Sequence, residues 1–173
     1  QRQMCIRDSE AGFPEGSINI VTGLGEKSGS SLIKHPDINH ISFTGSVEIG
    51  KKVQTEAAKN LIPVTLELGG KSPQIVFEDA NLEKALPFLI NAGIQNAGQT
   101  CSASSRILVS KKIYAELIDK MSKLYSKLKV AQAIDDKDLG PVISSRQREI
   151  ITNYLKLSKD LECISEGKFE TNL

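Results

Sequence analysis

The sequence predicts an α/β protein built on parallel strands. Short apolar segments that end at glycines alternate along the chain with segments rich in Ala, Glu, Lys and Gln, which favour helix. Over the first 70 residues the order is strand, helix, strand, helix, strand, which is typical of a parallel sheet with crossover helices. With 39% hydrophobic and 25% charged residues, the 173-residue chain has the composition of a globular protein with a buried core.

Three segments in the first half predict strands, because apolar residues alternate within them and glycine stops them. They are residues 16–23, 40–46 and 62–70. A helix is expected after the glycine-rich turn at 23–29 and should reach about Lys34. A second helix is expected over residues 47–60, where Ser46 can act as the N-cap.

The second half predicts two more strands and three more helices. The strands are expected in residues 72–80, which end in a turn, and in residues 106–110. The helices are expected over 81–98, 111–130 and 146–160, the last with Ser144 or Ser145 as its N-cap. Apolar residues at three- and four-residue intervals in the second of these helices predict a face turned toward the core. They are Tyr114, Leu117, Ile118, Met121, Leu124, Tyr125 and Leu128.

Charge and hydropathy exclude several functional classes. The chain carries 22 Lys and Arg against 21 Asp and Glu, a net charge of +1, so we expect neither a nucleic-acid nor a membrane partner. No apolar run reaches the roughly 18 residues that a membrane span needs, and the N-terminus lacks the pattern of a signal peptide. Cys5, Cys101 and Cys163 are odd in number and widely spaced, so neither a disulfide framework nor a metal site is expected. We therefore expect a cytoplasmic protein.

Cys101 lies in the stretch NAGQTCSASSR, among small and polar residues. An unpaired cysteine is most often an inert core residue, but these neighbours offer no apolar wall to bury the thiol. The stretch therefore makes a reactive cysteine an alternative to the commoner inert one, and composition alone does not decide between them. Pairing with His35 or His40, as in a thiol hydrolase, is an alternative, although both histidines fit ordinary loop or strand-start positions.

Glu67 closes the apolar strand VTLEL immediately before two glycines. In an open α/β sheet, a carboxylate at the carboxyl end of a strand lies at the rim where ligands bind, although a salt-bridged edge residue is an equal alternative. The glycine turns at 23–29 and 44–46 precede expected helices, whose N-termini attract phosphate. Neither turn has the G-x-G-x-x-G fingerprint of dinucleotide-binding folds, so alone each indicates no more than a loop.

Three segments together, FTGSVEIGKK, LELGGKSPQIVFEDA and NAGQTCSASSR, closely resemble the NAD(P)-dependent aldehyde dehydrogenase superfamily in order and spacing. The similarity runs from about Glu10 to the end of the chain. It implies the second half of a Rossmann-like cofactor domain over residues 10–69, joined to the first half of an α/β catalytic domain over residues 70–173. Residues 1–9 match neither the family nor an element pattern, and we expect a non-native leader there, with no role for Cys5.

The resemblance also implies what the residues do. Cys101 corresponds to the nucleophile and Glu67 to the general base that act when an aldehyde is oxidised to a carboxylic acid through a thiohemiacetal and a thioester. NAD or NADP is the implied cofactor, and a homo-oligomer, dimer or tetramer, is the implied assembly; no metal is implied. The cofactor contacts implied are Gly45 and Ser46 at the pyrophosphate, Ile49 beside them, Gly25 in the turn on the adenosine side, and Leu68 near the nicotinamide ribose.

The chain also departs from the family pattern. The family's chains are roughly three times longer, and several cofactor-binding and oxyanion-binding segments have no counterpart in this sequence. We therefore expect an internal fragment that is inactive by itself. An inactive relic that keeps the fold without the reaction is the non-enzymatic alternative.

Overall fold

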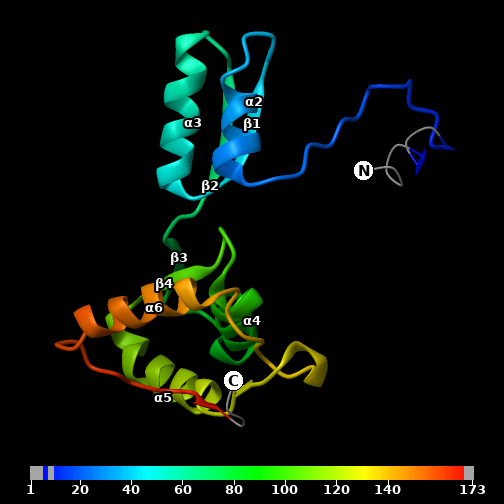
Figure 1. Ribbon diagram of the computed structural model, residues 1–173. Helices are drawn as coiled ribbons and strands as arrows, with labels where there is room; N and C mark the ends of the chain where they lie inside the picture. Colours follow the sequence, from blue (N-terminus) through cyan, green and yellow to red (C-terminus); the bar gives the residue numbers. More distant parts are fainter. Residues whose placement is uncertain (1–5, 8–9, 170–173) are drawn as a thin grey trace. The chain divides into compact units, whose positions relative to one another are not determined.

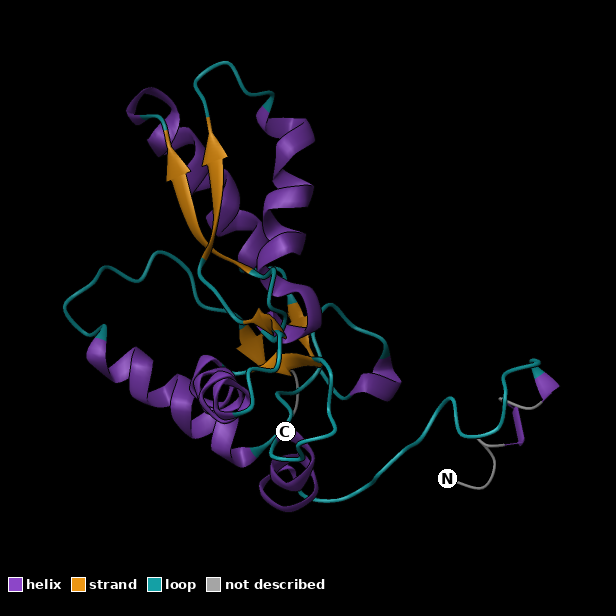
Figure 2. Ribbon diagram, turned by 90° about the horizontal axis from the view of Figure 1, so that it is seen from above, coloured by secondary structure: helices purple, strands orange, loops and turns teal. Residues whose placement is uncertain are grey.

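The computed structural model describes residues 6, 7 and 10–169 of the chain (Figures 1 and 2). The expected leader over residues 1–9 thus lies largely outside the described residues. The chain separates into two compact units, Gln1–Leu68 and Gly69–Leu173. Each unit has its own strands, crossover helix and apolar core.

The first unit is built on a β–α–β crossover. Strands β1 (Ile41–Gly45) and β2 (Val64–Leu68) pair in parallel, from Ile41 opposite Val64 to Gly45 opposite Leu68. Helix α3 (Val47–Lys59) connects them and packs on both, as Figure 1 shows. The apolar core of this unit consists of Val53 and Ala57 of α3 with Ile41 and Ile62. Both strands and the helix confirm the expectations from sequence.

Helix α3 approaches β2 most closely at Gly50. A Cβ atom at this position would lie 2.7 Å from Cδ2 of Leu68, closer than side-chain atoms approach one another in proteins. Glycine lowers the stability of a helix interior by about 1 kcal/mol relative to alanine. Its presence in a segment that otherwise favours helix is explained by the lack of space for a side chain beside Leu68.

Upstream of β1, the π-helix η1 (Gly25–Gly29) continues into α2 (Ser30–Ile33), which confirms a helix after the glycine turn. The predicted strand over residues 16–23 is wrong, because these residues form turns and irregular structure. An isolated strand is not stable without a hydrogen-bonded neighbour, and no strand of the described chain pairs with this segment. Apolar alternation alone therefore misled the prediction at this point.

The second unit repeats the crossover. Strands β3 (Ser72–Val76) and β4 (Ser104–Val109) pair in parallel, and α4 (Leu82–Ile94) connects them. The predicted helical stripe of α5 (Tyr114–Tyr125) supplies Leu117 and Met121 to the core, with Val76 and four α4 residues. Those four are Leu82, Leu86, Leu89 and Ile90.

The remaining elements of the second unit are short, apart from one helix. They are η2 (Gln95–Gly98), η3 (Lys111–Ile113), β5 (Lys129–Val130), η4 (Ala133–Asp135), α6 (Ser145–Leu157) and β6 (Lys168–Phe169). Of the two caps proposed for α6, Ser144 is the one that forms, since its Oγ accepts a hydrogen bond from the amide of Gln147 at 3.2 Å. β5 and β6 pair in parallel.

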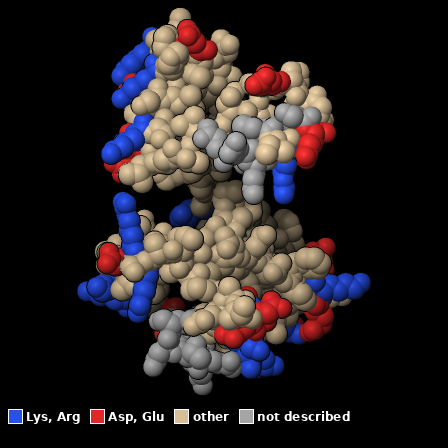
Figure 3. All heavy atoms as spheres, turned by 45° about the vertical axis from the view of Figure 1, so that its right-hand side comes forward, with Lys and Arg blue, Asp and Glu red and all other residues tan. Residues whose placement is uncertain are grey.

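Charged groups of both signs are mixed on the molecular surface, as the face in Figure 3 shows for both units. Many of them form pairs along or between helices. Lys120 of α5 hydrogen-bonds to Glu83 of α4, and this interaction raises the pKa of Lys120. None of the helices in residues 6–7 and 10–169 combines the length and apolar character that a membrane span requires.

Candidate active site

Cys101 lies in a tight turn between α4 and β4, and its side chain is exposed. The amide of Ala103 donates to the carbonyl of Thr100 at 3.0 Å, which closes the turn around Cys101 and Ser102. β4 begins directly afterwards, so the thiol is at the amino end of the parallel pair β3–β4. An exposed thiol in a closed turn fits a reacting group, and it does not fit the inert core cysteine weighed from sequence.

The backbone before this turn is strained. The prediction of one helix over residues 81–98 is wrong at its end, because α4 stops at Ile94. Asn96 and Ala97 then adopt left-handed conformations with φ of 51° and 54°, and Gly98 follows at φ 76°. A side chain with a Cβ atom is disfavoured there by roughly 1 kcal/mol or more, most clearly for alanine, which has no polar group to compensate. Three successive left-handed residues turn the chain out of α4 toward Cys101.

Replacing Ala97 with glycine is expected to stabilise the protein by about 0.5–1 kcal/mol, because glycine adopts positive φ without the Cβ clash. Thermal unfolding followed by circular dichroism measures the change. Ala92→Gly within α4 is the matched control and is expected to destabilise, since glycine is a poor helix former. Equal destabilisation by both changes would contradict a left-handed Ala97.

Glu67 is exposed near the carboxyl end of β2, opposite Thr44 of β1. The next pair in the register joins Leu68 to Gly45, and Ser46 follows Gly45. Because the strands are parallel, the candidate base and the candidate phosphate turn meet at one end of the sheet. The first unit therefore brings together five of the residues expected at the site: Gly45, Ser46, Ile49, Glu67 and Leu68.

Ser46 is the N-cap of α3, as predicted, and its Oγ accepts a hydrogen bond from the amide of Ile49 at 3.3 Å. The hydroxyl hydrogen of Ser46 remains able to donate to a ligand oxygen. The start of a 13-residue helix also carries partial positive charge, which attracts phosphate. Val47 and Ile49 are both more than two-fifths exposed beside it, so an apolar surface adjoins the polar helix start.

Gly25 belongs to the same unit but begins a separate helix, η1. A Cβ atom at Gly25 would meet no other atom within 4 Å, so the backbone is open to approach there. Open backbone at Gly25 and a capped helix start at Ser46 are features that suit a phosphate-bearing dinucleotide. Cys101 is in the second unit, separate from these residues.

Both histidines belong to the first unit and have partners within it. Nε2 of His40 lies 3.1 Å from Oγ1 of Thr65, and Nδ1 of His35 accepts a hydrogen bond from the amide of Asp37 at 3.3 Å. The sequence has two histidines in all, so the unit that contains Cys101 has none. A cysteine–histidine pair therefore cannot form within that unit.

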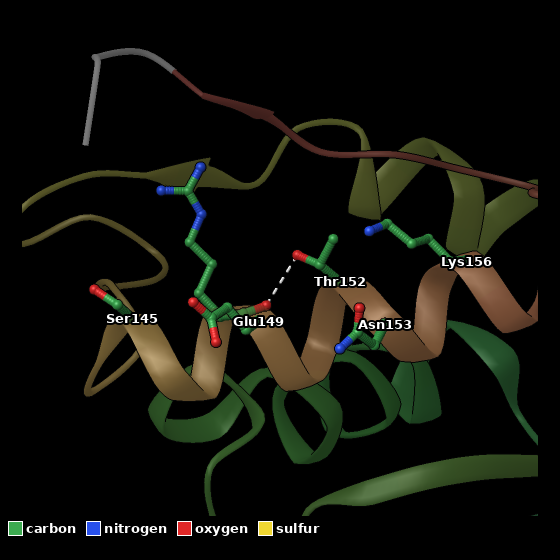
Figure 4. Close-up of a pocket in the computed structure, with 6 residues that line it drawn as sticks. Ser145, Glu149, Thr152, Asn153 and Lys156 are labelled. Carbon is green, nitrogen blue, oxygen red and sulfur yellow. Dashed lines mark hydrogen bonds between the residues drawn. The ribbon is translucent and has the colours of Figure 1, made fainter.

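Other candidate sites in the described chain are weak. No group of three or more His, Cys, Asp or Glu side chains among residues 6–7 and 10–169 is arranged to hold a metal ion. A hollow of about 480 Å³ is lined only by residues of α6, including Arg148, Thr152 and Lys156 (Figure 4). Its six lining side chains rise from one helix, and the hydrogen bond drawn there runs from Thr152 to the Arg148 carbonyl. This hollow is a groove along a helix surface and contains none of the expected site residues.

Sequence reasoning missed two residues near the expected site, Gly50 inside α3 and Gln99 in the loop before Cys101. A glycine inside a strongly helical segment was an available signal for Gly50. No local signal distinguished Gln99, whose side chain accepts a hydrogen bond from the amide of Ile143, 44 residues away in sequence.

Comparison with known proteins identifies the family and the fold of the chain. Residues 6–172 match the family model described as "Aldehyde dehydrogenase family". The chain is 45% identical over 152 residues to DhaS of Bacillus subtilis (strain 168), covering 87% of this chain and 31% of that protein. It is 44% identical to the peroxisomal aminoaldehyde dehydrogenase 1 of Pisum sativum, over 93% of this chain and 30% of that protein.

A crystal structure of betaine aldehyde dehydrogenase from Staphylococcus aureus in complex with NAD+ superposes with a TM-score of 0.83. The two proteins are 40% identical over 88% of this chain and 30% of the other. The chain thus spans about a third of the length of the relatives it matches. With a family match over residues 6–172 and fold agreement at 40% identity, the chain belongs to the aldehyde dehydrogenase family.

Proposed function

We propose that this sequence forms the central part of an NAD(P)-dependent aldehyde dehydrogenase, with Cys101 as nucleophile and Glu67 as general base. The observation that supports it best is the exposed thiol of Cys101 in a closed turn, in a chain of this family. Glu67 at the sheet end that carries the Ser46 helix start is the second support.

In the proposed reaction, the Cys101 thiolate attacks the aldehyde carbon, and a sulfur–carbon bond forms as the carbonyl oxygen becomes an oxyanion. The cofactor, when bound, accepts the hydride that leaves this thiohemiacetal carbon. The carbon that remains is a thioester, which is at the oxidation level of the acid. Glu67 then takes a proton from a water molecule, the water oxygen attacks the thioester carbon, and Cys101 leaves as thiolate while the carboxylic acid forms.

The cofactor contacts proposed are those of the first unit. Ser46 and the start of α3 suit the pyrophosphate, because helix N–H groups and the serine hydroxyl point donors at anionic oxygens. Gly25 leaves its backbone open to approach, whereas the space beside Gly45 is filled by the Phe43 ring, 2.6 Å from where a Cβ atom would stand. Gly45 is therefore proposed as a contact through its backbone at the end of β1, and Ile49 and Leu68 contribute apolar and backbone contacts nearby. These groups are compatible with either NAD or NADP.

A graft provides the test. Residues 10–169 replace the matching segment of the Staphylococcus aureus betaine aldehyde dehydrogenase, to which the chain is 40% identical. We expect the purified graft to form NADH from NAD+ and betaine aldehyde, while the 173-residue chain alone forms none under the same conditions. A correctly folded graft without activity would contradict the proposed function and favour the inactive relic.

The graft also separates the two enzyme classes weighed from sequence. A thiol hydrolase that used Cys101 would cleave an ester or thioester without NAD+, whereas the proposed oxidation depends on it completely. Measuring acid formation with and without NAD+ therefore distinguishes them.

We further propose that the complete enzyme is located in the cytoplasm, a reducing compartment, and that it is a homo-oligomer. A catalytic thiol must stay reduced between turnovers, which suits a compartment that does not form disulfides. Light scattering of the graft measures the assembly, and a monomeric active graft would contradict the second part.

A further inference from the structure

Gln99 joins the loop that carries Cys101 to a distant part of the second unit. Its Oε1 accepts a hydrogen bond from the amide of Ile143 at 2.9 Å. Its Nε2 donates to the carbonyl of Asn96 at 3.1 Å, and the side chain of Asn96 donates in return to the carbonyl of Gln99 at 3.3 Å. Both ends of one amide are thus engaged, one within the loop and one outside it.

The outside partner is held in place from both directions. Ile143 directly precedes Ser144, the N-cap of α6. On its other side, the chain is tied to the β5 region at Leu139, whose amide donates to Lys129 at 3.1 Å and whose carbonyl accepts from Ala131 at 3.0 Å. The Ile143 amide is therefore a donor fixed between a helix start and a backbone bridge.

The loop itself needs such an anchor. Residues 96–98 are in the left-handed conformation, which three successive residues adopt only when the surrounding structure enforces it. Gln99 directly follows these residues and is two positions before Cys101. Its half-buried side chain bonds to Asn96, at the start of the strained segment, and to Ile143, outside the loop.

We propose that Gln99 is a positioning residue for Cys101, fixing the thiol for attack on the aldehyde by bonding the loop to the start of α6. This role rests on the proposed function. Gln99 does not itself touch the reacting atoms in this mechanism. Misplacing a nucleophile by about 1 Å can reduce a rate on the order of 100-fold, so a lost anchor is expected to have a large kinetic effect.

The first test uses the 173-residue chain and does not depend on catalysis. Gln99→Met keeps the length of the side chain and removes both hydrogen bonds, while Gln99→Asn keeps the amide but is one methylene too short to reach Ile143. Amide hydrogen exchange should become faster at Ile143 in both variants. Gln132→Met, at an exposed glutamine, is the matched control and should leave this amide unchanged. Unchanged exchange at Ile143 in both Gln99 variants would overturn the anchor.

The second test uses the graft and follows the first turnover. We expect the rate of the pre-steady-state NADH burst to fall roughly 10- to 100-fold in Gln99→Met, with the KM for betaine aldehyde changed by less than about twofold. Thermal unfolding midpoints of the variant and the unsubstituted graft should agree closely. An active graft whose burst rate is unaffected by Gln99→Met would overturn the positioning role. An inactive unsubstituted graft would instead refute the proposed function, and the positioning role with it, while the exchange experiment still decides whether Gln99 anchors the loop.

Discussion

We expect Cys101→Ala to reduce aldehyde oxidation by the graft on the order of 10³-fold or more, because the sulfur that forms the thiohemiacetal is gone. Neither the burst nor the steady rate of NADH formation should survive. Stopped-flow absorbance at the NADH band measures both phases. Since the Cys101 side chain is exposed, its removal leaves the core intact, and the unfolding midpoint should change little.

Cys163 is the matched control for this substitution, because it is the other exposed cysteine of the described chain. Cys163→Ala should retain the activity of the unsubstituted graft. A limiting amount of iodoacetamide should label Cys101 and abolish activity in proportion to the label. Substantial turnover by Cys101→Ala, or inactivation that follows labelling of Cys163, would show that the nucleophile has been assigned wrongly.

Glu67→Gln is expected to slow steady turnover about 10²- to 10⁴-fold and to leave the NADH burst largely intact. The amide is nearly the same size as the carboxylate but does not accept the proton of the attacking water, so the thioester accumulates. A burst close to one NADH per active site, followed by a slow phase, is the expected signature. Mass spectrometry of the acid-quenched enzyme should then find the acyl group on Cys101.

The control for this change is Glu56→Gln on α3, in the same unit. Glu56 forms a hydrogen-bonded ion pair with Lys59 at 2.8 Å, and that contact lowers the pKa of Glu56. Lys59 is exposed and Glu56 is partly exposed, and a surface pair of this kind contributes little to stability, so both kinetic phases should persist. If Glu67→Gln removed the burst together with the slow phase, Glu67 would act before the thioester, on Cys101 or on the fold.

Local chemistry was sufficient to predict most elements of the fold. Ser46 caps α3 as expected because a serine before a helix-favouring segment satisfies a free amide. The stripe that includes Leu117 and Met121 faces the core because apolar residues at helical spacing lie on one face of the helix, which is buried away from water. These outcomes depend on residues within one or two turns of each other.

Features that depend on distant partners were not predictable in the same way. Residues 16–23 have the alternation of a strand but lack a paired strand in the described chain. Asn96 and Ala97 lie in a segment that favours helix, yet they take left-handed conformations in a loop that is bonded to Ile143. At the site, composition alone left a reactive Cys101 and a rim position for Glu67 as alternatives to ordinary structural roles, and the roles of nucleophile and base came from the family resemblance.

The close contact between Gly50 and Leu68 has a consequence for engineering cofactor use. Any side chain at position 50 must push Leu68 aside, because its Cβ atom would lie 2.7 Å from the leucine methyl group. Leu68 is adjacent to Glu67 in β2 and opposite Gly45 in β1. With the roles proposed above for Leu68 and Glu67, directed-evolution libraries that vary position 50 are expected to alter cofactor affinity and thioester turnover together, although Gly50 itself is buried. Libraries meant to change cofactor preference alone should leave Gly50 fixed and vary the exposed positions Val47 and Ile49.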